Sequence, residues 1–79
     1  MQSNLIQALQ SLKMDTVKMS LSLVKVNQSL TAVLDCITED PDIKEINLRL
    51  ADLGDSLSTF TDNLEEFEMH GRYFTGGTL

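Results

Sequence analysis

The chain has 79 residues, enough for one small domain or one piece of a larger assembly. Its 12 acidic and 6 basic residues give a net charge of −6, which argues against binding nucleic acid through phosphate contacts. One proline and four glycines are too few for the frequent turns of an all-β domain, and one cysteine excludes a framework of intrachain disulfides.

The first predicted element is a long helix over about residues 2–38. Apolar residues recur in alternating steps of four and three, the spacing of the a and d sites of a heptad repeat lettered abcdefg. Thr16 is the one polar residue in this series. The d sites are Leu5, Leu12, Met19, Val26 and Val33, and the a sites are Leu9, Thr16, Leu23, Leu30 and Ile37.

A turn is predicted at residues 39–41, because the heptad phase slips there. Counting on from Ile37, the next a site would be residue 44, yet the second apolar series begins at Ile43. Pro41 disfavours helical geometry at Asp40. Asp40 is therefore predicted to cap the next helix, with Pro41 at its first position and Asp42 in its first turn.

The second predicted helix covers about residues 41–70 and has an unbroken heptad pattern. Gly71 is predicted to end it, which makes 1–71 the hairpin and 72–79 a C-terminal tail. In that tail, Tyr73 and Phe74 could cover Leu5 and Leu9 at the start of the chain. The a sites of this helix are Ile43, Leu50, Leu57 and Leu64, and the d sites are Ile46, Leu53, Phe60 and Phe67.

The predicted fold is all-α, an antiparallel two-helix coiled-coil hairpin, since a short loop makes consecutive helices antiparallel neighbours. Folding at the turn predicts layers in which a sites meet a sites and d sites meet d sites. The predicted hairpin core comprises Leu12, Met19, Leu23, Val26, Leu30, Val33, Ile37, Ile43, Ile46, Leu50, Leu53, Leu57, Phe60, Leu64 and Phe67.

Two helices leave every core side chain open on one flank, so a partner is expected to complete a helical bundle. Small polar residues at the e and g sites, such as Ser22, Ser29, Ser56 and Asn63, would let another helix approach closely. A second apolar stripe at f and b sites is the predicted partner interface: Met14, Val17, Leu21 and Val24. Copies of this chain or a different protein could cover it, and the third interpretation is chance exposure of apolar residues without a partner.

Charge is unevenly distributed along the chain. Residues 1–34 carry three lysines against Asp15, a net of +2, and residues 35–79 carry 11 acids against three basic residues, a net of −8. Most acids of the second helix fall at b, c or f, the solvent side, which predicts a solvated face. The other interpretation is a surface for a basic partner, or phosphate mimicry by an inhibitor.

No catalytic, cofactor-binding or metal site is predicted, and the chain is not expected to be an enzyme. Phosphate-binding loops, His-Glu-x-x-His and Cys-x-x-Cys are absent from the sequence. His70 is the single histidine and is expected to be exposed at a helix end, where Glu66 one turn earlier could pair with it. Cys36 is interpreted as a small packing residue near the core.

In outline, the length, the two helices and Asp40-Pro41-Asp42 at the turn resemble the subunits of type III secretion needles. The strict heptads and the glycine-containing tail depart from that family's pattern. Helical hairpins of this size also occur as phage regulators, secretion chaperones and subunits of eukaryotic coiled-coil assemblies, so form alone does not assign a function.

The expected function is that of a non-enzymatic assembly or adaptor subunit acting through coiled-coil contacts with itself or other helical proteins. The alternative is a small acidic inhibitor or regulator, for example phage-encoded, that occludes a partner's binding surface. No signal peptide or membrane span is expected, because the first residues lack a basic start and charges interrupt every helix-length window. The expected location is the cytoplasm, or a virus or assembly built there.

Overall fold

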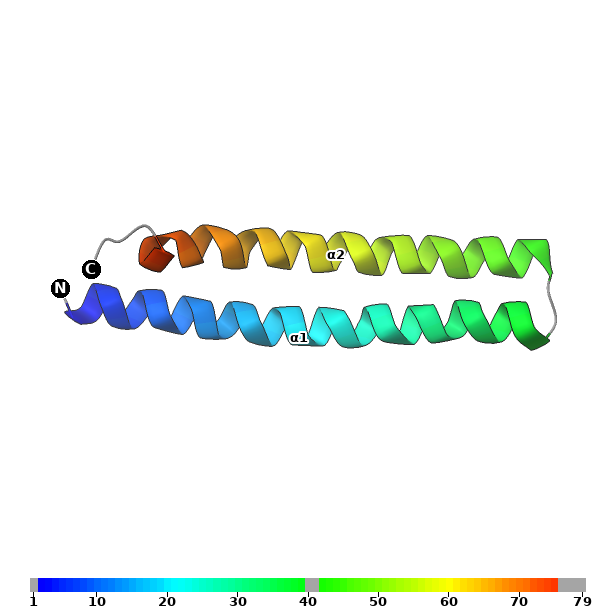
Figure 1. Cartoon of the computed structure of the whole chain (residues 1–79), viewed down its shortest axis with the longest axis horizontal. Helices are drawn as coiled ribbons and strands as arrows, with labels where there is room; N and C mark the ends of the chain where they lie inside the picture. The colour runs from blue at the N-terminus through cyan, green and yellow to red at the C-terminus, as the bar shows by residue number, and fades with distance from the viewer. Residues whose placement is uncertain (1, 40–41, 76–79) are drawn as a thin grey trace.

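The computed structural model describes residues 2–39 and 42–75, which form two long helices. Helix α1 spans Gln2–Glu39 and helix α2 spans Ile43–Thr75. They lie side by side and antiparallel, so the first turns of α1 and the last turns of α2 are at the same end of the molecule (Figure 1). The predicted all-α hairpin is confirmed.

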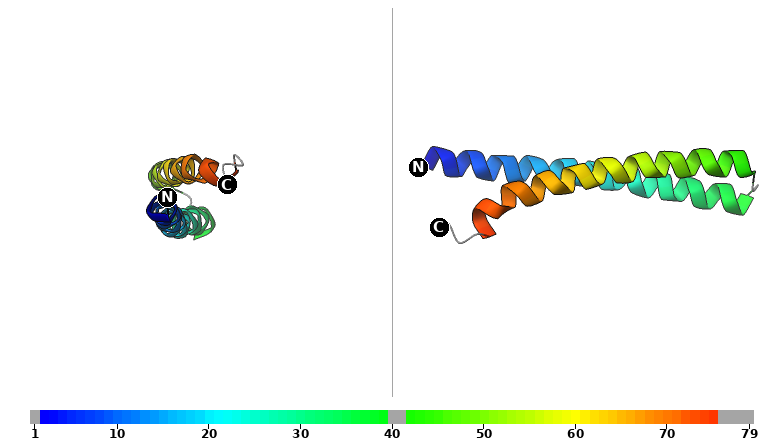
Figure 2. Two further views of the ribbon diagram at one scale, coloured as in Figure 1. Left: turned by 90° about the vertical axis from the view of Figure 1, so that its left-hand side faces the viewer. Right: turned by 90° about the horizontal axis from the view of Figure 1, so that it is seen from above.

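The hairpin is a layer one helix thick, 58 Å long and 16 by 14 Å across. Seen from above, the two helices cross near the middle of their length, and their outer ends diverge (Figure 2). Each helix is therefore covered by protein on one side only. Among the described residues no large side chain is fully buried, and Val26 and Val33 are the only buried hydrophobic ones.

Asp42 caps α2, which corrects the predicted cap at Asp40. The backbone N–H of Lys44 donates to Oδ1 of Asp42 at 3.1 Å, and the N–H of Ile46 donates to its carbonyl at 2.9 Å. This is the geometry of an N-cap residue, which satisfies amides at the start of a helix that have no intrahelical acceptor. Helix α2 thus begins at Ile43, two residues later than predicted, while Asp40 and Pro41 lie outside the described residues.

Helix α2 continues through Gly71 to Thr75, so the predicted stop at Gly71 is wrong. A glycine costs a helix only about 1 kcal/mol relative to alanine. The d-site series also runs on, because Phe74 follows Phe67 by seven residues and is half-buried. Of the two residues that Tyr73 and Phe74 could cover, Leu5 is half-buried and Leu9 remains exposed, and the side chain of Tyr73 and residues 76–79 lie outside the described part.

The seam between the helices is formed by d and g sites, where a and d sites were predicted. Every d site from Leu5 to Phe74 is buried or half-buried. The g sites beside them, among them Ala8, Ser29 and Ser56, are also buried or half-buried, except for Arg49, which is exposed near the turn. Their short side chains let the two helices approach closely on this face.

The a sites consequently lie on one flank of the seam, which corrects their assignment to the hairpin core. Among the a-site residues of the predicted core, Leu64 is half-buried. The other six a-site residues of that core are between 44% and 75% exposed: Leu23, Leu30, Ile37, Ile43, Leu50 and Leu57. Facing leucines at these sites would hold the helices further apart than the small g residues do. The predicted layers of a on a sites therefore do not form within one chain.

The hairpin can be tested by cross-linking across the seam. Ser29 Oγ and Ser56 Oγ are 3.0 Å apart, so Ser29→Cys with Ser56→Cys, in a Cys36→Ser background, is expected to form a disulfide within one chain. Mass spectrometry of the oxidised protein under denaturing conditions checks this. Disulfides found only between chains would contradict the hairpin.

Candidate functional site

Six polar side chains at g sites form a line along the seam, which we call the polar seam. It consists of Asp15, Ser22 and Ser29 on α1 and Ser56, Asn63 and His70 on α2. Along each helix these residues are seven positions apart, or about two turns, and each contacts the one opposite. The seam therefore holds these three cross-helix polar pairs at regular intervals.

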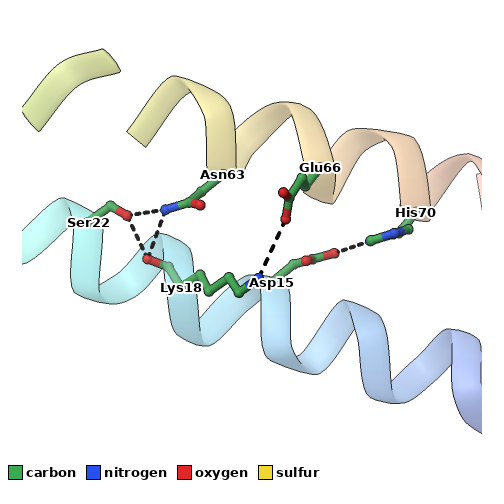
Figure 3. A network of polar contacts seen from close by, with 6 residues as sticks. All are labelled: Asp15, Lys18, Ser22, Asn63, Glu66 and His70. Carbon is green, nitrogen blue, oxygen red and sulfur yellow. Dashed lines mark hydrogen bonds and ion pairs between the residues drawn. The ribbon is translucent and has the colours of Figure 1, made fainter. Parts of the chain in front are cut away.

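Asp15 is the most deeply buried charged or polar residue of the seam, at 3% exposure. Its Oδ2 lies 2.6 Å from Nδ1 of His70, whose side chain is 39% exposed (Figure 3). A carboxyl group enclosed between two helices needs such a partner, because burial removes its hydrogen bonds to water. The pair therefore links the C-terminal part of α2 to α1.

His70 was expected to be exposed with Glu66 as its possible partner, and the structure corrects both points. The g site of His70 turns the imidazole towards α1, where Asp15 is the acceptor or donor. Glu66 lies at a c site, beside the seam, and its carboxylate is 3.7 Å from Nζ of Lys18. Both members of this second pair are about half exposed, so it contributes little to stability.

The side-chain amide of Asn63 forms the hydrogen bonds at the middle of the polar seam. Its Nδ2 donates to Oγ of Ser22 and to the backbone carbonyl of Lys18, the latter at 3.4 Å (Figure 3). Ser22 Oγ itself donates to the same carbonyl at 2.7 Å. Within the described residues, no buried side-chain nitrogen or oxygen lacks a hydrogen-bond partner.

This arrangement fixes the register of the two helices. Sliding α2 by one turn would separate all three polar pairs at once and leave the Asp15 carboxyl group buried alone, which is costly. Polar groups in a helical interface are known to specify register in this way. The sequence contains small polar residues at e and g sites, but their spacing does not predict that the g residues of the two helices meet.

The predicted partner interface lies on the outside of α1. Met14, Val17, Leu21 and Val24 are each between 47% and 65% exposed, and the hairpin covers none of them. They remain a prediction for an interface, which needs a partner to be tested.

A second apolar surface, the a-site flank, is not predicted by the sequence, because all of its members except Leu9 belong to the predicted hairpin core. The g sites of the two helices face each other at one edge of the seam. Going across the seam from that edge, each helix presents its d sites next and its a sites last. The a sites of both helices therefore lie at the opposite edge. On α1 small side chains at e sites leave a groove beside the leucines, lined by Ser20, Leu23, Val24, Val26, Asn27 and Leu30. The a-site flank consists of Leu9, Leu23, Leu30, Ile37, Ile43, Leu50 and Leu57.

In the described part of the chain, no three His, Cys, Asp or Glu side chains are placed to hold a metal ion. Neither helix, over the same residues, is long and apolar enough to cross a membrane. Comparison of the chain with protein-family models, with curated proteins and with solved structures gave no match. Function must therefore be argued from the surfaces described above.

The polar seam gives a prediction about stability. His70→Ala should lower the free energy of unfolding by about 1–3 kcal/mol, because it leaves the buried Asp15 carboxyl group without its partner. Asp15→Leu combined with His70→Leu should cost less, since it removes both polar groups together. Urea denaturation followed by circular dichroism, at one protein concentration, measures the free energy of unfolding of the wild type, the single variant and the double variant.

The matched control is Glu66→Ala, which removes only the exposed pair with Lys18 and should change the free energy of unfolding by less than about 0.5 kcal/mol. An equal loss for His70→Ala and Glu66→Ala would show that Asp15 does not depend on the imidazole.

Proposed function

We propose that this protein is a non-enzymatic assembly or adaptor subunit whose helical hairpin is completed by helices of a partner. The observation that carries the proposal is the balance of buried and exposed apolar side chains. Among the residues that the structure describes, fifteen large hydrophobic ones are exposed, whereas two hydrophobic ones are buried. So small a core is marginal for a chain of this size, and partner helices would supply the missing burial.

The stripe of Met14, Val17, Leu21 and Val24 supports a contact on the outer side of α1. It runs along about three turns of the helix, and soluble monomers rarely leave apolar surface of this extent uncovered. A helix with apolar residues on two faces is typically packed on both. In this proposal the partner is protein, and the subunit acts in the cytoplasm or in a virus or other assembly built there.

The second candidate function is a small acidic inhibitor or regulator, and the charge of α2 favours it. Seven acidic and three basic residues give residues 43–75 a net charge of −4, whereas residues 2–39 carry three of each sign. The acids of α2 lie mainly on its exposed side, where they could oppose a basic surface of a target. An inhibitor of this kind would bind through α2 and would not need the apolar stripe.

Val17→Lys with Leu21→Lys tests the favoured function. The double variant should lose the partner and the mass of the assembly while keeping its helices, because two lysines cannot be buried in an apolar contact. We would purify the tagged full chain from its own cells under mild conditions, measure the intact complex by native mass spectrometry, and follow helicity by circular dichroism.

The control is Gln7→Lys with Gln28→Lys, which adds the same charge at exposed f sites of α1 outside the stripe. It should keep both partner and mass. If the Val17 and Leu21 variant keeps them too, the stripe is not the interface and the acidic face of α2 becomes the functional surface.

A further inference from the structure

We propose that the a-site flank binds a second copy of this chain, forming an antiparallel four-helix bundle in which α1 of each copy lies on α2 of the other. The proposal deepens the assembly role proposed above and shares with it only the premise that the exposed apolar side chains become covered. It concerns a different surface from the stripe, because the flank includes residues of both helices, and Val24 lies at the border of the two.

The size of the flank suits a dimer. Its seven leucine and isoleucine side chains are about half exposed or more, which corresponds to roughly 600 Å² of apolar surface on one side of the hairpin. This is at the upper end of the roughly 300–600 Å² found for the largest apolar patch of a typical monomer, and it approaches the roughly 800 Å² per partner that a specific interface buries. A second hairpin offers the same surface, with the same length and width.

The register set by the polar seam makes the flank complementary to itself. Since Ser29 faces Ser56, Leu57 lies level with the interval between Leu23 and Leu30, and Leu50 with the interval between Leu30 and Ile37. A two-fold axis parallel to the helices leaves all heights along them unchanged. The leucines of α2 in the second copy would therefore enter the intervals between those of α1, as knobs enter holes.

Small residues at three of the e sites, Ser20, Asn27 and Gly54, provide room for this packing. Ser20 and Asn27 form the floor of the groove on α1 between the a-site leucines and Val24. Gly54 lies at the corresponding e site of α2, and a Cβ atom added there would meet nothing within 4 Å. Side chains of a second hairpin can thus approach both helices beside their leucines.

Charge favours this orientation over the alternative, in which α1 lies on α1 and α2 lies on α2. Residues 43–75 have a net charge of −4, so α2 lying on α2 would bring two acidic helices together. Stacking α1 on α2 instead sets the acidic helix against residues 2–39, whose acidic and basic residues balance. Lys13 of one copy would then lie at the end of the bundle that holds Glu65 and Glu68 of the other, an attractive arrangement.

Sedimentation equilibrium of the pure chain tests the dimer, with two leucines of α2 as a matched pair. The wild type should have twice the 8.8 kDa mass of one chain at tens of micromolar. Leu50→Lys, on the flank, should raise the dissociation constant by at least about 100-fold, because each interface would bury two unpaired charges. Leu48→Lys, on the outer face and 63% exposed, should change it less than about threefold.

Cross-linking between differently labelled chains tests the orientation without charged substitutions. A chain with Leu30→Cys is mixed with one carrying Leu57→Cys, both in the Cys36→Ser background. The mixture should form disulfide-linked heterodimers faster than either chain forms homodimers, since the two sites come from helices that face each other. Equal or faster cross-linking of Leu30→Cys with itself would overturn the arrangement.

A wild type that stays monomeric at 100 μM, or equal effects of Leu48→Lys and Leu50→Lys, would overturn the dimer. These outcomes are separate from the failure of the proposed function. A chain that is monomeric alone but binds another protein through Val17 and Leu21 would exclude the second copy and leave the assembly role standing.

Discussion

The hydrogen bond between Asp15 and His70 is the constraint on which the rest of the structure depends. A carboxyl group at 3% exposure can be accommodated only where a partner reaches it, and His70 is the residue of α2 that does so. With Ser22–Asn63 and Ser29–Ser56 it requires the g sites of the two helices to face each other. The face at which the helices meet, and their register, follow from these three pairs.

The rotation of the seam has a direct consequence for apolar burial. Bringing g sites into the seam satisfies the polar groups there but moves the a-site leucines to one flank, where they are about half exposed. Polar pairs of this kind contribute modestly to net stability, and their larger effect is to exclude other registers. The chain thus has a well-defined register and an incomplete core.

The two helices have different surfaces, which bears on their roles in an assembly. Around α1 the exposed apolar side chains continue from the a sites to the b and f sites, so both the flank and the stripe include this helix. On α2 the apolar exposure is mainly at the a sites, and the remaining surface is rich in Asp and Glu. An arrangement in which α1 makes most contacts and α2 keeps the assembly soluble is consistent with this division.

The sequence by itself determined the number, approximate extent and antiparallel packing of the helices, because heptad periodicity and a proline-containing turn depend only on local spacing. It also located the d sites and the stripe of Met14, Val17, Leu21 and Val24. It could not determine whether the a sites or the g sites would join the d sites in the seam, because the leucines at a sites are predicted to be buried from their hydrophobicity alone. Only the tertiary structure decided this, because the polar residues of one helix gain their partners from the other, more than 25 positions away in the chain. The end of α2 was likewise decided by Phe74 continuing the d-site series past Gly71.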